Sequence, residues 1–483
     1  MTPIMAREDS YNETYIELPP DFLFGAATSA YQIEGGWNAD DKGPSIWDRF
    51  THRKGRIHKG HNGDRAADTY RDFQADIDIM REMGLDAYRF SISWPRVMPE
   101  GRGHANERGL DYYERLVDAL LAAGIAPFPT LFHWDLPQAL ESNIGGFSHR
   151  DVAAHFADYA AAVVGRLGDR VSHWVTLNEP WVHSTFGYMT GIHAPGRRNP
   201  WAYLRAVHHQ LLGHGLATQR IRDIAPQAQV GLSLNLTPFY PATASLLDHQ
   251  ARDMADQILN RLFLDPIFRG RYPDLFWHKL RPFHPKIQPG DMELIAQPLD
   301  FLGVNYYTRS RVRHSRAIPF LHLWATDIPV MSGKREGEPE STYTDMGWEV
   351  YPAGLFELLL RLKKEYGNPP LYITENGAAY ADEVDPDGRV RDGARRAYLE
   401  QHLAVTGAAA RAGVDVRGYF VWSLIDNFEW THGYDKRFGI VHVDFDTQKR
   451  TVKDSGRWYA ELIRKTRAAT RKGTLDPDSS SHQ

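Results

Sequence analysis

The chain has 483 residues, of which 42% are hydrophobic and 24% charged, with 56 Lys and Arg against 61 Asp and Glu. This apolar content and a net charge of only −5 exclude a disordered chain, and the lack of a basic excess argues against binding to nucleic acid or an anionic membrane. Because the chain has no cysteine, disulfides, thiolate metal sites and thiol nucleophiles are excluded.

The ends and the apolar runs of the chain predict where it works. No apolar run approaches the roughly 18–20 residues that span a bilayer, and residues 1–10 lack the apolar stretch of a secretion signal. We therefore expect a cytoplasmic protein with no nucleic-acid or membrane partner. We expect one domain over residues 16–470 between flexible ends at 1–15 and 471–483. The sequence leaves open whether this domain forms a homo-oligomer.

Short apolar runs alternate with amphipathic segments along the chain. Eight runs have the near-continuous apolar character of strands buried on both faces, at residues 22–30, 87–92, 125–132, 173–177, 230–236, 301–304, 371–374 and 418–423. Tyr70, Phe73, Ile77 and Met80 recur at helical steps before Gly84, and similar faces occupy residues 110–120 and 152–163. Eight strand–helix units predict an α/β fold, a single (β/α)8 or TIM barrel.

An open doubly wound sheet that binds a nucleotide is the alternative fold. Neither of its usual phosphate-binding motifs, G-x-G-x-x-G and G-x-x-x-x-G-K-[ST], follows a predicted strand. Long segments at 31–65, 180–200 and 306–348 follow the first, fourth and sixth strands. In a barrel, such loops surround the rim that carries the active site, which also favours the barrel.

Carboxylate, amide and indole groups collect where the predicted strands end. In a closed parallel barrel these ends meet at the catalytic face. The residues there are Gln32, Glu34, Arg89, His133, Trp134, Asp135, Asn178, Glu179, Asn305, Tyr306, Tyr307, Glu375, Asn376 and Trp422. Neither an H-x-H nor an H-E-x-x-H motif accompanies them, and the spacing of His208, His209 and His214 does not suit one helix face. We therefore expect no metal and no other cofactor.

Two glutamates, Glu179 and Glu375, end the fourth and seventh strands. Barrel dimensions place such inward side chains with their carboxyl groups roughly 6 Å apart. Glycosidases that retain anomeric configuration need about 5–5.5 Å, and those that invert it need about 6.5–9.5 Å. The estimate favours retention only slightly, and a salt bridge at the rim is the structural alternative.

At the two glutamates the sequence resembles a known family. T-L-N-E-P at 176–180 and I-T-E-N-G at 373–377 resemble the two signatures of family 1 glycoside hydrolases, and the resemblance is to bacterial β-glucosidases. Further matching segments are F-G-A-A-T-S-A-Y-Q-I-E-G at 24–35, Y-R-F-S-I-S-W at 88–94, H-W-D-L-P at 133–137, W-S-L-I-D-N-F-E-W at 422–430 and R-F-G at 437–439. This ordered set extends from about residue 18 to about residue 465.

The resemblance implies a role for each matching residue. Glu375 is the expected nucleophile and Glu179 the expected acid and base of a retaining double displacement. Arg89, Asn305 and Tyr307 would support Glu375, and Asn178 would bind the sugar 2-hydroxyl. The residues expected to hold the other hydroxyls are Gln32, His133, Glu429 and Trp430, with Trp422 as the platform under the ring. Trp348 matches a wall on the side of the leaving group and Phe438 matches a hydrophobic rim, and packing alone is the alternative for both.

The implied activity is hydrolysis of terminal β-D-glucosyl residues, as in cellobiose and aryl or alkyl β-glucosides, which suggests a part in cellulose degradation. Glu429 stands where phosphate-binding members of the family carry serine, so we expect an unphosphorylated sugar. Three alternatives stay open. They are a broader β-galactosidase, β-fucosidase or transglycosidase, a non-catalytic sugar-binding barrel, and a metal-dependent barrel hydrolase.

Overall fold

The computed structural model describes residues 16–317, 323–325 and 343–475. Within these residues, eight parallel strands close into a barrel in the order β1-β11-β10-β7-β5-β4-β3-β2. They are β1 Leu23–Ala27, β2 Ala87–Ser91, β3 Ala126–Phe132, β4 His173–Asn178, β5 Gln229–Asn235, β7 Phe301–Asn305, β10 Leu371–Asn376 and β11 Val416–Trp422. Each strand overlaps one of the eight predicted runs, so the predicted (β/α)8 barrel is confirmed.

The inside of the barrel is a packed core. Phe128, Val175, Phe301 and Phe420 come from four different strands and belong to one buried cluster, which also contains Trp422 at the end of β11. The alternate side chains of the same strands pack outward against helices, so β2 and β10 are buried at every position. This two-sided burial is the reason why the strands are nearly continuous in apolar residues.

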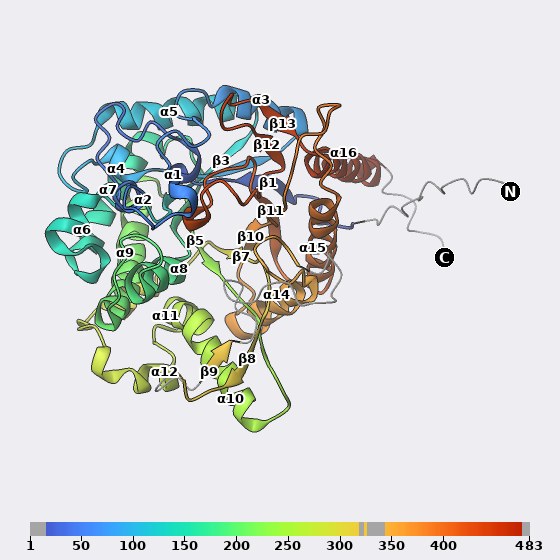
Figure 1. Ribbon diagram of the computed structural model, residues 1–483. Coiled ribbons are helices and arrows are strands. Elements are labelled where there is room, and N and C mark those ends of the chain that lie inside the picture. The colour runs from blue at the N-terminus through green and yellow to red at the C-terminus, as the bar shows by residue number, and fades with distance from the viewer. Residues whose placement is uncertain (1–15, 318–322, 326–342, 476–483) are drawn as a thin grey trace.

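Helices surround the strands, as Figure 1 shows. They are α3 Gln74–Met83, α5 Glu107–Ala122, α7 Asp151–Leu167, α9 Pro200–Ile224, α14 Pro352–Tyr366, α15 Gly393–Arg411 and α16 Asp454–Leu475. The helix expected from Tyr70 onward begins only at Gln74, whose backbone N–H donates to Asp72 Oδ1 at 3.2 Å. Tyr70 lies before this helix and packs against Tyr112 of α5, with ring centroids 4.7 Å apart.

The segments after the strands carry the extra structure of the fold. The segment after β1 contains α1 Ala30–Ile33 and α2 Ile46–Thr51, and the segment after β4 contains α8 Pro180–Ser184. The segment after β7 is described only in part, because residues 318–322 and 326–342 lie outside the described residues. Residues 1–15 and 476–483 also lie outside them, and α16 continues to Leu475. The domain boundaries therefore stay a prediction.

Two features were not predicted from the sequence. Between β5 and β7, residues 236–300 form the short strand β6 Phe239–Pro241 and the helices α10 Leu246–Asp256, α11 Leu262–Arg269, α12 Asp274–Lys279 and α13 Asp291–Ile295. After β11, β12 Val441–Val443 and β13 Arg450–Val452 pair antiparallel. Three-residue strands carry too little periodicity to be recognised in a sequence.

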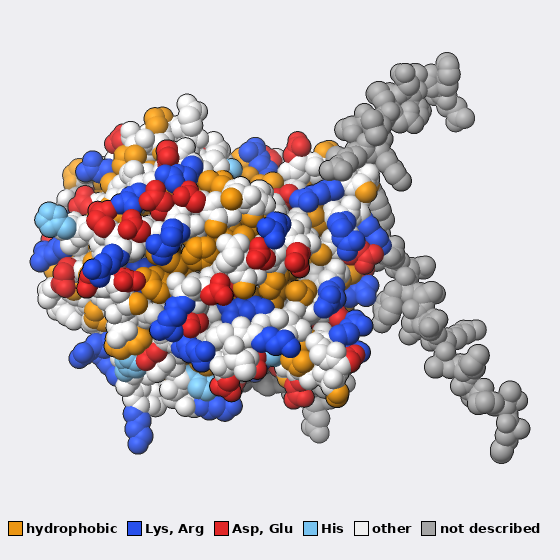
Figure 2. Space-filling view, turned by 90° about the horizontal axis from the view of Figure 1, so that it is seen from above, with side chains coloured by type: hydrophobic (Ala, Val, Ile, Leu, Met, Phe, Trp, Pro, Cys, Tyr) orange, Lys and Arg blue, Asp and Glu red, His pale blue; other side chains and the backbone are white. Residues whose placement is uncertain are grey.

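The outer surface carries charges of both signs. On the face seen in Figure 2, acidic and basic side chains alternate among apolar ones. Ion pairs such as that between Arg166 Nη1 and Asp111 Oδ1, at 2.8 Å, link neighbouring outer helices. None of the described helices is both long enough and apolar enough to cross a membrane.

Candidate active site

The predicted site residues come from different strands and meet at the carboxyl end of the barrel. Arg89 lies in β2 and Glu375 in β10, while Asn178, Asn305 and Trp422 are the last residues of β4, β7 and β11. Glu179 follows β4 directly, with a left-handed backbone at φ 45° and ψ 60°. All six side chains are buried. Parallel pairing of β7 with β10 sets Asn305 beside Glu375 in register.

The Arg89 guanidinium binds both Glu375 and Asn178. Its Nη1 donates to Glu375 Oε1 at 2.6 Å and its Nη2 to Asn178 Oδ1 at 2.6 Å. Its Nε donates to Thr130 Oγ1 at 3.2 Å. Arg89 is fully buried, so its charge depends on these partners in place of water. Removal of the Glu375 carboxylate would leave that charge without its counter-ion.

Both oxygens of Glu375 are held by donors. The Tyr307 hydroxyl donates to Oε2 at 2.6 Å, opposite the Arg89 contact at Oε1. Burial raises the pKa of Glu375, and the Arg89 charge and the Tyr307 hydrogen bond act in the opposite direction. The two donors therefore favour the ionised form of a carboxyl group that burial alone would keep protonated.

Glu179 has a different environment. Its Oε1 accepts from Asn305 Nδ2 at 2.8 Å and from Asn235 Nδ2 at 3.2 Å, and both donors are neutral amides. Burial and then the negative charge of Glu375 raise the pKa of Glu179 to about 8. The two glutamates therefore have different surroundings, since a guanidinium favours the charged form of Glu375 and only neutral amides bind Glu179.

Asn305 lies between the two carboxyl groups. Its amide bonds Glu179, and a hydrogen bond from the same side chain lowers the pKa of Glu375. Asn305 Nδ2 also donates to Asn178 Oδ1 at 3.0 Å, and Asn305 stands in register with Glu375 across the paired strands β7 and β10. Both acids therefore face one space at the barrel mouth.

His133 is buried beside Asn178. Asn178 Nδ2 donates to His133 Nε2 at 3.0 Å, so the ring proton resides on Nδ1. Burial and the nearby Arg89 charge lower the pKa of His133 well below its ordinary value, which keeps the ring neutral. His133 Nδ1 has no hydrogen-bond partner among the described residues. A neutral ring with a free donor can bind a hydroxyl group.

Gln32 and Glu429 form a second polar group. Gln32 Nε2 donates to Asn427 Oδ1 at 3.0 Å, to the Phe428 carbonyl at 2.9 Å and to Glu429 Oε2 at 3.4 Å. Burial, followed by the charges of Glu375 and Glu179, raises the pKa of Glu429 to about 8. Glu429 therefore lies near enough to Glu375 and Glu179 for their charges to affect its pKa.

Aromatic rings complete the walls. The His133 ring lies nearly parallel to Trp422 at 5.7 Å and to Trp430 at 6.0 Å, measured between centroids. Trp348 and Phe438 instead pack with Tyr307, at 5.1 and 6.2 Å, and lie 6.0 Å from each other. The structure thus brings together the residues to which the resemblance gives a role, whereas Glu34 instead binds Arg96 and Tyr113. The aromatic residues of the site make two sets of ring contacts.

Asn235 and Asn427 are neighbours of the site that were not predicted, and Trp134 was predicted only for its place at a strand end. Asn235 contacts Glu179, Asn427 contacts Gln32, and Trp134 Nε1 donates to the Asn178 carbonyl at 2.9 Å. Asn235 is the last residue of β5, so its place at a strand end was a signal that could have identified it. The other two act on backbone or amide groups that the sequence does not place.

The three histidines of α9 have other partners. His208 contacts Tyr272 and Asp291, His209 Nδ1 contacts the Phe147 carbonyl, and His214 contacts Thr176. Across the described ranges, no group of three His, Asp or Glu side chains is arranged to hold a metal ion.

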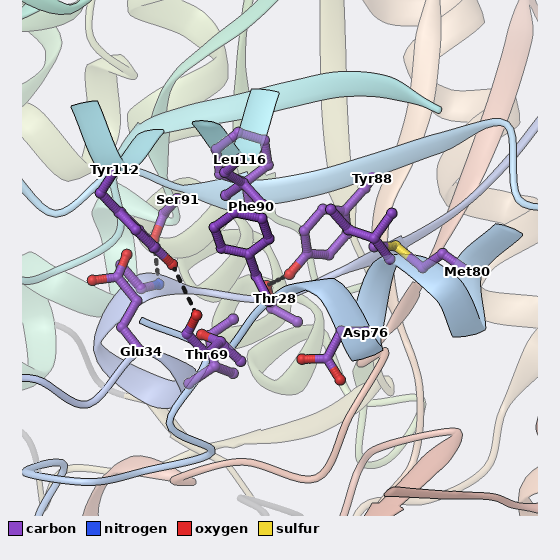
Figure 3. Close-up of a pocket in the computed structure, with 14 residues that line it drawn as sticks. Thr28, Glu34, Thr69, Asp76, Met80, Tyr88, Phe90, Ser91, Tyr112 and Leu116 are labelled. Atoms are coloured by element: carbon purple, nitrogen blue, oxygen red, sulfur yellow. Dashed lines mark hydrogen bonds between the residues drawn. The ribbon is translucent and has the colours of Figure 1, made fainter. Parts of the chain in front are cut away.

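A small cavity of about 20 Å³ lies away from the site, where α3 and α5 pack on β1 and β2. Figure 3 shows Thr28 and Tyr88 joined across it, with a distance of 2.6 Å between their hydroxyl oxygens. Of the candidate residues at the predicted strand ends only Glu34 lines this cavity, and none to which the resemblance gives a role does so. Its volume suffices for about one water molecule. It belongs to the packing of the barrel wall.

Comparison with known proteins identifies the family. The family model described as glycosyl hydrolase family 1 matches residues 14–468. Beta-glucosidase A of Acetivibrio thermocellus is 45% identical over 93% of this chain and 98% of its own length, and the beta-glucosidase of an Agrobacterium species is 45% identical over 93% and 96%. The solved structure of a Thermotoga maritima beta-glucosidase in complex with deoxynojirimycin has a TM-score of 0.89 and 44% identity, over 94% of this chain and 99% of that one. The chain belongs to glycosyl hydrolase family 1 and is a glycoside hydrolase.

Proposed function

We propose that this protein is a retaining β-glucosidase that removes terminal, non-reducing β-D-glucosyl residues through a covalent glycosyl-enzyme. The observation that carries the proposal is the pair of buried carboxyl groups with opposite surroundings. Glu375 binds Arg89 and Tyr307, which favour its charge, whereas Glu179 binds amides and has a pKa of about 8. A double displacement needs one ionised and one protonated carboxyl group at the same bond.

In the first step, a Glu375 oxygen attacks the anomeric carbon, and the bond to the leaving oxygen breaks. The Glu179 proton moves to that oxygen, so the aglycone departs as a neutral alcohol and Glu179 becomes ionised. The Glu375 oxygen that forms the ester gives up its charge. Arg89 and Tyr307 hold the carboxylate in place before attack, so little reorganisation is required.

In the second step, water attacks the same carbon from the side that the aglycone has left. The ester carries no charge, so the interaction that raised the pKa of Glu179 has disappeared, and Glu179 is ready to accept the proton of the water. Cleavage of the ester restores the Glu375 carboxylate and releases glucose with its original configuration. One carboxyl group thus serves as acid and then as base.

The polar groups around the space favour a monosaccharide as the glycone. Asn178, His133, Gln32 and Glu429 supply amide, imidazole and carboxyl contacts for hydroxyl groups, and Trp422 offers an apolar face for the ring. The proposal includes cellobiose and aryl β-glucosides as substrates. The cytoplasmic location, a part in cellulose degradation and homo-oligomer formation stay predictions.

The glycone preference can be tested with 4-nitrophenyl glycosides. We expect kcat/KM to be highest for the β-glucoside among the β-glucoside, β-galactoside, β-fucoside and α-glucoside. The α-glucoside is the control and should not react, because its leaving oxygen lies on the wrong face for Glu179. A β-fucoside or β-galactoside that reacts faster than the β-glucoside would favour the broader β-glycosidase.

Replacement of the nucleophile tests the double displacement. In Glu375→Gly we expect hydrolysis to fall by at least about 10³-fold, since the covalent step is lost. Arg89 Nη1 and Tyr307 Oη would remain as donors around the vacated space, where azide or formate can bind and restore part of the rate. NMR spectroscopy of the product made in azide should show an α-glycosyl azide.

The matched variant for this experiment is Glu179→Ala, because it removes the opposite carboxyl group. Azide that enters from the acid–base side should attack the glycosyl-enzyme and give the β-glycosyl azide. The same anomer from both variants, or undiminished hydrolysis by Glu375→Gly, would show that the two roles are wrongly assigned.

The decrease in glycosylation rate caused by Glu179→Ala should depend on the leaving group. A 2,4-dinitrophenolate departs without a proton, so the glycosylation rate for that substrate should change by less than about tenfold. Cellobiose releases a sugar alkoxide and should lose about 10²–10⁴-fold, the usual contribution of general acid catalysis. Pre-steady-state bursts and cellobiose hydrolysis measure the two rates, and equal losses on both substrates would argue against the acid role.

The pH profile follows from the same pair. Glu179 must be protonated in the free enzyme, so kcat/KM should fall as the pH rises through the Glu179 pKa of about 8. In Glu375→Gln the negative charge that contributes to this pKa is absent, so NMR titration of Glu179 should give a lower value than in the wild type. A Glu179 pKa that is unchanged or higher in that variant would contradict the electrostatic coupling.

A further inference from the structure

Behind the rim formed after β10 and β11 lies a set of charged side chains that the proposed reaction does not use. We call it the buried ion cluster, and it contains Asp382, Asp392, Arg395, Asp426, Arg437 and Lys453. Three carboxylates balance three cations. The side chains of Asp392, Arg395, Asp426 and Lys453 are fully buried, and that of Arg437 is 23% exposed. Charges so far from water must each be matched by a partner.

Asp426 lies at the centre of this cluster. Its Oδ1 accepts from Lys453 Nζ at 2.7 Å and its Oδ2 from Arg437 Nη1 at 2.7 Å. It also accepts the backbone N–H of Gly439 at 3.0 Å and that of Val443 at 3.4 Å. One carboxylate therefore ties the beginning of the segment after β11 to the later part of the same segment.

Phe438 is held on both sides by this cluster. The carbonyl of the preceding residue, Arg437, accepts from Arg395 Nη2 at 2.7 Å, and the N–H of the following residue, Gly439, donates to Asp426. The Phe438 carbonyl accepts from the Ser423 N–H at 3.3 Å, next to the end of β11. The backbone around Phe438 is thus fixed by charged groups that lie outside the substrate space.

The Phe438 ring contacts residues of the candidate active site, so its position affects theirs. It contacts Tyr307 and Trp348, and Tyr307 binds Glu375. Phe438 also shares a buried cluster with Trp422, whereas Trp430 belongs to a different cluster. A displacement of Phe438 would therefore act directly on Trp348, the residue that matches the aglycone-side wall.

We infer that Asp426 is a positioning residue that sets aglycone recognition by fixing Phe438 through the buried ion cluster. The inference rests on the proposed function and on the match of Trp348 to an aglycone-side wall. The class of ligand that depends on it is an apolar or aromatic leaving group, which can pack against such rings.

The test variant is Asp426→Asn, which keeps the shape of the side chain and removes its charge. We expect kcat/KM for 4-nitrophenyl β-glucoside to fall about tenfold, mainly through KM. The inhibition constant of deoxynojirimycin, which mimics the glycone and has no aglycone, should stay within about twofold of the wild type. A loss of fold or of general activity would change both constants together.

The matched control is Asp291→Asn. Asp291 is also buried and binds Arg150 and His208, but it lies in α13, between outer helices. Both variants should lower the melting temperature, and only Asp426→Asn should change the ratio of KM to the inhibition constant. If Asp426→Asn does not fold, Arg437→Gln replaces it, because that partly exposed side chain tolerates the change better, and the same ratio is measured.

An unchanged ratio in a folded Asp426→Asn or Arg437→Gln protein would overturn the inference, as would an equal change in Asp291→Asn. Failure of the proposed function is a separate result. It would appear in the wild type as a lack of glucoside hydrolysis, before any variant is compared.

Discussion

The exclusion of water from a pair of carboxyl groups is the constraint around which the site is arranged. Burial raises the pKa of both Glu179 and Glu375, so without further partners neither would be reliably ionised at neutral pH. The Arg89 guanidinium removes this symmetry because it contacts Glu375 directly, and the Tyr307 hydroxyl adds to the effect. The ionised Glu375 in turn favours the proton on Glu179. A single buried cation thus gives two chemically identical side chains different electrostatic environments.

Arg89 can do this only because the barrel brings β2, β4, β7 and β10 to the same end. Its guanidinium reaches Asn178 on one side and Glu375 on the other, and Asn305 bonds Glu179 from β7. No local segment of the chain could make these contacts, since their members are separated by 89 to 286 positions. The large residues inside the barrel therefore support the site, because their packing fixes the distances between strands on which the hydrogen bonds depend.

The sequence was most informative where periodicity and strand ends coincide. All eight barrel strands were predicted, because parallel strands buried on both faces leave a continuous apolar signal, and their ends identified Arg89, Glu179 and Glu375. The helices of residues 236–300 were missed as an inserted unit, and so was the pairing of β12 with β13. Contacts such as that of Asn235 with Glu179 depend on the rotation of side chains at the rim, which neither spacing nor composition encodes.

The buried ion cluster around Asp426 and the pair formed by Glu179 and Glu375 differ in how their buried charges are balanced. Around Asp426, cations and carboxylates balance in number. Lys453 and Arg437 lower the pKa of Asp426, so this carboxylate stays charged and restrains the backbone of the segment after β11. At the barrel mouth, burial and then the negative charge of neighbouring glutamates raise the pKa values of Glu179 and Glu429 to about 8, and Arg89 is the cation nearby. An unbalanced group of acids can exchange a proton near neutral pH, which a balanced one cannot. The segment after β11 takes part in both, since Asp426 anchors it and Glu429 and Phe438 extend from it to the substrate space. Restraint at one end of this segment therefore permits precise contacts at the other.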